Sequence, residues 1–137
     1  MSCRNNQKTK VIKIVGNTYD KIVNDAEKDV IVLYTINKCE ACLDVSSTFT
    51  QLANYFNQDS NLIFGEIDMS KNEVGLQISS YPSIYFWPKK LKRFISFSSK
   101  KTLDELIHFV EENITDKVKN LILIHRMPHT YHQEALR

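Results

Sequence analysis

Two cysteines, Cys39 and Cys42, are separated by Glu40 and Ala41, and a third, Cys3, lies in the polar N-terminus. The C-x-x-C spacing is typical of a redox pair or of half a metal site. Residues three apart on a helix lie about one turn apart, so the two sulfurs can form a disulfide. The chemistry that this spacing indicates is thiol–disulfide exchange.

The exchange needs one thiolate and one resolving thiol. We expect Cys39 to lie at a helix start, where free N–H groups and the helix dipole favour an anion. Such a site lowers a cysteine pKa from about 8.5 toward about 7 or below. Cys39 is then the nucleophile that forms a mixed disulfide. Cys42, more buried and one turn further on, resolves it and releases the substrate.

The pattern around the pair predicts alternating strands and helices. Residues 29–36 are a nearly continuous apolar run, typical of a central strand buried on both faces, and the cysteines follow it directly. Apolar residues at helical spacing follow from Val45 to Phe56. The other predicted strands are 11–15, 61–68, 83–87 and 93–97. The other predicted helices are 18–25, capped by Thr18, and 70–77, together with a last helix from Thr102. The first three strands should pair in parallel and the last two as an antiparallel hairpin.

The last helix begins with a capping box, Thr102 and Glu105. Its apolar pattern either continues through Val118, Leu121 and Ile122 or breaks near Asn113. We therefore expect a flexible arm at 1–9, one domain at 10–126 with a long C-terminal helix, and a polar tail at 127–137 that is poorly ordered.

Composition narrows the functional classes. The 137 residues are 42% hydrophobic and 25% charged, with a formal net charge of +2. That charge is too small to favour nucleic acid or a membrane surface as a partner. No apolar run reaches the roughly 20 residues needed to span a bilayer. We expect no cofactor.

From Lys10 to about Asn113 the sequence resembles a catalytic thioredoxin domain of a protein disulfide isomerase, and most closely the C-terminal catalytic domain. The resemblance rests on the cysteine pair and on residues 15–30, 67–74, 80–88 and 101–107. It implies an α/β thioredoxin fold, with a central mixed five-stranded sheet flanked by helices, and disulfide isomerase-like activity. It also implies that Pro82 is a cis-proline beside the cysteines and that the backbone of Tyr81 pairs with substrate.

The chain departs from that family around the pair. Isomerase motifs read Trp-Cys-Gly-His-Cys, whereas Lys38, Glu40 and Ala41 stand here. Glu40 opposes thiolate formation and Lys38 favours it. Leu33 occupies the position of a buried family glutamate that relays the proton of the second cysteine, and Lys101 or Lys100 replaces a family arginine. Because a destabilised thiolate favours the disulfide, we expect a pair less oxidising than the typical isomerase.

Two alternatives stay open. The pair could be a structural disulfide in a non-catalytic chaperone or protein-binding module. A zinc site would need about two more ligands, and the candidates His125, His129 and His132 lie close together near Met127, far from Cys42 in the sequence. Cys3 is most simply a free thiol.

The resemblance implies protein substrates with cysteines or disulfides, a redox partner protein or glutathione, and the endoplasmic reticulum lumen. No signal peptide or Lys-Asp-Glu-Leu-like ending is visible, which fits either a piece of a longer protein or a cytoplasmic reductase. Asn113-Ile114-Thr115 is a glycosylation sequon, relevant only in the secretory pathway.

Overall fold

A computed structural model describes residues 11–91 and 93–115. The predicted arm 1–9 and the tail 127–137 lie outside these ranges. So do Val118, Leu121 and Ile122, the expected continuation of the last helix. Within the described part, helix α4 (Leu103–Asn113) ends at Asn113. The helix therefore breaks near Asn113, and it is not the long helix that we expected for the domain.

A mixed five-stranded sheet forms the centre of the structure, as the sequence predicts. Its strand order is β1-β3-β2-β4-β5. Strands β1, β3 and β2 run parallel, β4 pairs with β2 antiparallel, and β5 pairs with β4 antiparallel. The strands are β1 (Val11–Ile14), β2 (Asp29–Thr35), β3 (Leu62–Asp68), β4 (Ser83–Trp87) and β5 (Ile95–Ser96).

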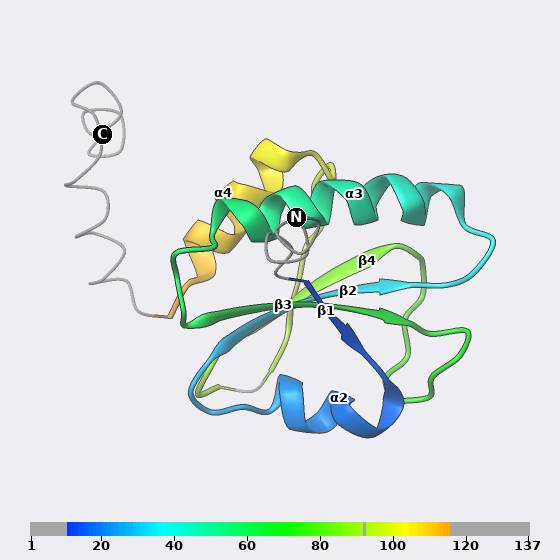
Figure 1. The fold of residues 1–137 in the computed structure, drawn as a ribbon, viewed down its shortest axis with the longest axis horizontal. Helices are drawn as coiled ribbons and strands as arrows, with labels where there is room; N and C mark the ends of the chain where they lie inside the picture. Colours follow the sequence, from blue (N-terminus) through cyan, green and yellow to red (C-terminus); the bar gives the residue numbers. More distant parts are fainter. Residues whose placement is uncertain (1–10, 92, 116–137) are drawn as a thin grey trace, which may run out of the picture.

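Helices cover both faces of this sheet (Figure 1). Helices α3 (Glu40–Tyr55) and α4 lie on one face, and α2 (Gly16–Val23) lies on the other. Every residue of β2 is buried, which explains its continuous apolar run. Ile31 and Leu33 enter the core beneath α3 and α4, whereas Val32 and Tyr34 enter the core on the α2 side.

A hydrogen-bonded group of aromatic side chains organises the core on the α2 side. The Tyr34 and Tyr19 hydroxyls lie 2.7 Å apart, and the Trp87 indole N–H donates to the Tyr34 oxygen at 3.1 Å. Burial raises the pKa of Tyr34 far above its ordinary value, so this hydroxyl stays protonated. The group therefore satisfies its polar atoms internally and joins α2 to β2 and β4.

Asp29 is a buried carboxylate at the start of β2, with 2% of its surface exposed. One of its oxygens accepts from the Lys89 N–H at 2.8 Å and from the Thr115 hydroxyl at 2.6 Å. The other accepts from the Thr115 N–H at 2.9 Å. Asp29 thus fixes the chain after α4 to the central strand, because leaving a buried carboxylate without donors is costly.

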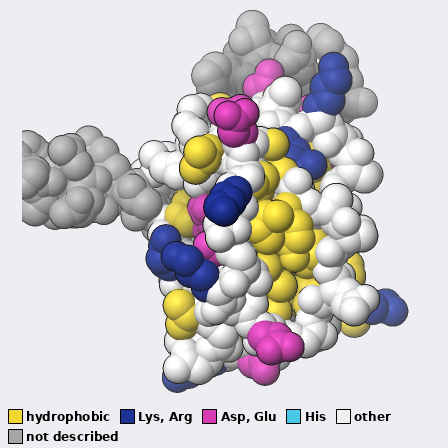
Figure 2. All heavy atoms as spheres, turned by 90° about the vertical axis from the view of Figure 1, so that its right-hand side faces the viewer, with side chains coloured by type: hydrophobic (Ala, Val, Ile, Leu, Met, Phe, Trp, Pro, Cys, Tyr) yellow, Lys and Arg dark blue, Asp and Glu magenta, His cyan; other side chains and the backbone are white. Residues whose placement is uncertain are grey.

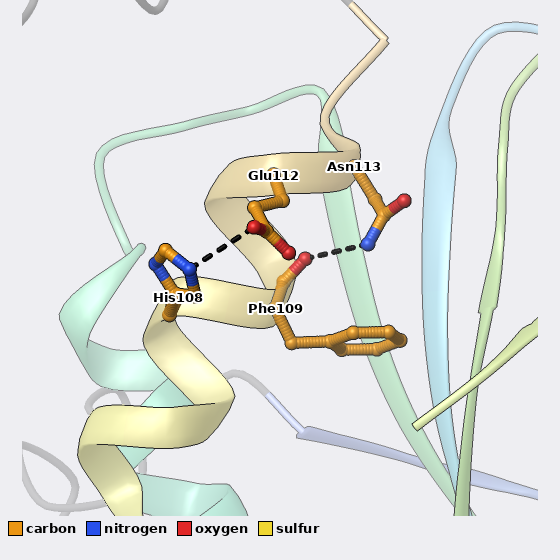
Figure 3. Close-up of polar contacts among 4 residues, drawn as sticks. All are labelled: His108, Phe109, Glu112 and Asn113. Atoms are coloured by element: carbon orange, nitrogen blue, oxygen red, sulfur yellow. Dashed lines mark hydrogen bonds and ion pairs between the residues drawn. The ribbon is translucent and has the colours of Figure 1, made fainter. Parts of the chain in front are cut away.

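The C-terminal end of α4 also has internal partners (Figure 3). The Asn113 side-chain amide turns back and donates to the Phe109 carbonyl at 2.8 Å, and His108 pairs with Glu112 at 3.0 Å on the exposed face. The sequon side chains Asn113 and Thr115 therefore both take part in structural hydrogen bonds.

Three local predictions were wrong. Thr18 is not the N-cap of α2: Val15 is, and the Thr18 hydroxyl accepts from the Val15 N–H at 3.3 Å. Residues 70–77 form a turn at 70–71 followed by irregular structure, and not a helix. There the Asn72 side chain donates to the Asp68 carbonyl at 2.9 Å and accepts from the Gly16 N–H at 2.8 Å, and such bonds compete with helix formation. Strand β5 is shorter than 93–97, and both of its residues are exposed at the sheet edge.

The contact between β1 and β3 at Gly65 gives a testable prediction. A methyl group at Gly65 would lie 3.0 Å from Ile14 Cγ1 and closer still to Cδ1, and Ile14 is buried. We expect Gly65→Ala to lower the free energy of unfolding by about 1–3 kcal/mol through overpacking, measured by urea denaturation.

Gly16→Ala is the matched control, because the nearest atoms to its added methyl group are 3.7 Å away. Equal stability of the two variants would contradict the predicted overpacking at Gly65.

Candidate active site

The cysteine pair lies where the central strand ends and α3 begins. Strand β2 ends at Thr35, a short loop follows, and Cys39 is the N-cap residue of α3. Cys42 lies in the first turn and is 4% exposed, whereas Cys39 is partly exposed. The fold thus presents one sulfur to a partner molecule and keeps the other inside.

The two cysteines form a disulfide, with their Cα atoms 5.2 Å apart. The Cys42 N–H donates to Cys39 Sγ at 3.0 Å. This N–H is one of the donors that the start of a helix leaves without a backbone acceptor. After reduction, the same donor and the helix dipole would stabilise a thiolate on Cys39.

A cavity of about 560 Å³ lies beside the pair. Its lining includes both cysteines and two residues that sequence reasoning placed near them, Lys38 and Glu40. It also includes Glu66, the strand neighbour of Leu33, which sequence reasoning did not place there. Its charged lining residues are balanced in sign: Lys13, Lys38, Lys71, Glu40, Glu66 and Asp68. The Ser70 hydroxyl lowers the pKa of Asp68, so that carboxylate is charged at neutral pH.

The residues predicted to tune the thiolate take different places. Lys38 has a left-handed backbone, with φ of 53°, and lines the cavity with Glu40. Ala41 is exposed on the first turn of α3. Lys101 is half-buried just before Thr102, the N-cap of α4, and is not part of the cavity lining. The structure therefore brings Lys38 and Glu40 to the cavity but not Lys101.

The predicted substrate-binding residues immediately precede β4. The Tyr81–Pro82 peptide bond is cis. Pro82 is buried, and Tyr81 is half-buried against the core on the α2 side. Neither residue is part of the cavity lining.

Glu66 is a site residue that sequence reasoning missed. It follows Leu62 and Phe64 in the alternation of β3, on the face that packs under α3. The Ser46 hydroxyl of α3 contacts its two carboxylate oxygens at 2.9 and 3.1 Å. The available signal was a glutamate at a core-facing position of a predicted strand.

The face around the site carries a hydrophobic area (Figure 2). This view looks onto the end of the sheet at which β2 and β3 terminate, and the area lies between α3 above and α2 below. Leu43, next to Cys42, is 72% exposed. An exposed apolar surface beside a reactive group suits contact with a protein chain.

Neither a metal site nor a membrane span is found in the described ranges. Residues 11–91 and 93–115 contain no cluster of three or more histidine, cysteine, aspartate or glutamate residues suited to a metal ion. His125, His129 and His132 lie outside those ranges. No helix in the same ranges is long and apolar enough to cross a bilayer.

Comparison with known sequences extends these observations. A sequence profile described as thioredoxin matches residues 10–112. The protein disulfide-isomerase of Saccharomyces cerevisiae is 36% identical over 111 residues, which are 79% of this chain and 21% of that protein. Protein disulfide-isomerase A4 of Bos taurus is 31% identical over 115 residues, 80% of this chain and 18% of that protein. The chain thus spans about a fifth of the length of these curated relatives.

Solved structures agree on the fold. Chloroplastic thioredoxin z superposes with a TM-score of 0.66 at 21% identity, covering 75% of this chain and 93% of that one. The J-Trx1 fragment of ERdj5 gives a TM-score of 0.65 at 18% identity, covering 75% and 51%. At these identities the likeness establishes the thioredoxin fold alone.

The unequal exposure of the two sulfurs gives a prediction for the reduced protein. With limiting iodoacetamide, we expect Cys39 to be alkylated well before Cys42, because Cys39 is accessible and lies at the helix start. Peptide mass spectrometry in a Cys3→Ser background measures the order. Equal or preferential labelling of Cys42 would contradict it.

Proposed function

Because the chain belongs to the thioredoxin family, we propose that it is a disulfide isomerase-like thiol–disulfide oxidoreductase that acts on protein substrates through Cys39 and Cys42. The observation that carries the proposal is the hydrogen bond from the Cys42 N–H to Cys39 Sγ at the N-cap of α3. It supplies a donor to the sulfur that must carry negative charge during exchange.

The proposed reaction has two displacements. The Cys39 thiolate attacks one sulfur of a substrate disulfide, and the other substrate sulfur leaves as a thiolate. Cys42 then loses its proton and attacks Cys39 Sγ, which releases the second substrate sulfur and closes the Cys39–Cys42 disulfide. Two electrons pass to the substrate, and the reverse sequence oxidises it. A redox partner protein or glutathione restores the starting state.

We assign the substrate contact to the surface around the pair. Leu43 supplies exposed apolar area next to Cys42. By the resemblance to isomerase domains, the backbone of Tyr81 before Pro82 pairs with the substrate chain. The same resemblance supports the endoplasmic reticulum lumen as the location, with a cytoplasmic reductase as the alternative.

Insulin reduction by dithiothreitol tests the proposal. We expect the chain to accelerate insulin precipitation and Cys39→Ser to fall to the rate of dithiothreitol alone, because the variant lacks the nucleophile. Cys3→Ser is the matched control, since it removes a cysteine outside the pair, and it should keep the wild-type rate.

The alternative function is a binding or chaperone module with a structural disulfide. The apolar Leu33 and the exposed Leu43 favour it. A wild-type rate equal to that of Cys39→Ser would support this alternative and refute the oxidoreductase.

The direction of exchange depends on the residues around Cys39. Glu40 adds negative charge in the first turn of α3, and Ala41 supplies no cation. We expect a reduction potential more negative than the roughly −180 mV of protein disulfide isomerase, measured by equilibration in glutathione buffers. The double variant Glu40→Gly with Ala41→His should shift the potential upward. A wild-type potential at or above that of the double variant would overturn the prediction.

A further inference from the structure

Cys42 must lose a proton when it resolves the mixed disulfide. The proposed exchange does not yet say which group accepts that proton. Cys42 is 4% exposed, so bulk water has little access to its sulfur. A buried thiol resists ionisation because the charged form loses its hydration. The second displacement therefore depends on a base that the protein places near Cys42.

Position 33 cannot supply that base. Leu33 is fully buried in β2 and packs in the core beneath α3 and α4. The parallel pairing of β2 with β3 places Glu66 directly beside Leu33. Partners in register point to the same face of a sheet, so Glu66 also lies beneath α3.

Three observations connect Glu66 to Cys42. Both residues line the cavity of about 560 Å³ beside the disulfide. Ser46, which lines the same cavity, follows Cys42 by four residues on α3 and so lies on the same face one turn further on. The Ser46 hydroxyl lies 2.9 and 3.1 Å from the two oxygens of Glu66.

We propose that Glu66 receives the proton of Cys42 through the Ser46 hydroxyl when the mixed disulfide is resolved, and returns it when the disulfide opens. This inference rests on the proposed function and deepens it. It assigns a proton-transfer role to a carboxylate on β3, next to the strand position that Leu33 fills.

The step balances without a further reactant. Cys42 transfers its proton to Ser46 Oγ while the Ser46 proton moves to the Glu66 carboxylate. The sulfur electron pair of Cys42 forms the bond to Cys39 Sγ, and the bond from Cys39 to the substrate sulfur breaks. The substrate leaves as a thiolate, and Glu66 then releases its proton to that thiolate or to solvent.

Other charged groups share this cavity and bear on its pH dependence. Lys13 of β1 is the register partner of Glu66 on the side away from Leu33. The remaining charged residues of the lining come from the start of α3 and the segment ending β3: Lys38, Glu40, Asp68 and Lys71. Lys13, Lys38 and Lys71 therefore supply the positive charges among the groups that share the cavity with Glu66.

Rapid mixing of the reduced chain with a disulfide-bonded peptide tests the proposal, in a Cys3→Ser background. Acid quenching and mass spectrometry follow formation and decay of the mixed disulfide on Cys39. Glu66→Gln keeps an oxygen for Ser46 but cannot accept the proton. We expect formation at the wild-type rate and decay slower by about 10²-fold at neutral pH, the lower range for general base catalysis.

The pH profile separates proton transfer from a structural role. In Glu66→Gln, hydroxide must remove the proton, so decay should accelerate with pH and approach the wild-type rate in alkaline solution. Ser46→Ala should slow decay with the same pH trend. Glu27→Gln, an exposed carboxylate in the loop before β2, is the matched control and should match wild type.

The possible outcomes distinguish the role of Glu66 from the exchange function itself. Decay of Glu66→Gln at the wild-type rate, or slowed equally at every pH, would overturn the role of Glu66 and leave the exchange function intact. Absence of any mixed disulfide in the wild-type background would refute the exchange function itself, and the role of Glu66 with it.

Discussion

The complete burial of β2 is the constraint on which the rest of this structure depends. Its side chains enter both cores, so the strand has to lie in the middle of the sheet with helices on each face. Its position fixes where the chain emerges at Thr35 and hence where α3 can begin. Cys39 lies at the helix start because β2 ends at Thr35 and only three residues separate Thr35 from Cys39.

The polar contacts at the two ends of β2 have different roles. At its start, Asp29 is surrounded by donors from the chain after β4 and the chain after α4. That arrangement is closed and structural. Beyond its end, the Cys42 N–H of α3 donates to the Cys39 sulfur, which can exchange partners. The contacts at the start of β2 therefore stabilise the fold, whereas the end of β2 leads to a cysteine that can exchange disulfides.

The strand register beneath α3 places two charged residues and one apolar residue side by side on β1, β3 and β2: Lys13, Glu66 and Leu33. Leu33 keeps the central strand apolar, which preserves the core around Phe49 and Ile84. The carboxylate lies one strand further out, where the cavity gives it a polar partner in Ser46 and a cation on its other side. Glu66 is half-buried, and a carboxylate that is partly removed from water needs such partners.

The sequence by itself determined the order of the five strands and of helices α2, α3 and α4, although it also predicted a helix at 70–77 that does not form. It likewise determined the buried β2, the cysteine spacing and the cap of α4, where the Glu105 N–H donates to Thr102 Oγ1. These features follow from periodicity and local hydrogen bonding within a few residues. The tertiary structure alone decided that Glu66 lies beside Leu33 and under Ser46, that Thr115 reaches Asp29, and that Asn72 bonds Gly16 in place of a helix. Those contacts join residues far apart in the chain, so they depend on strand register and on the packing of helices against the sheet, which local pattern does not specify.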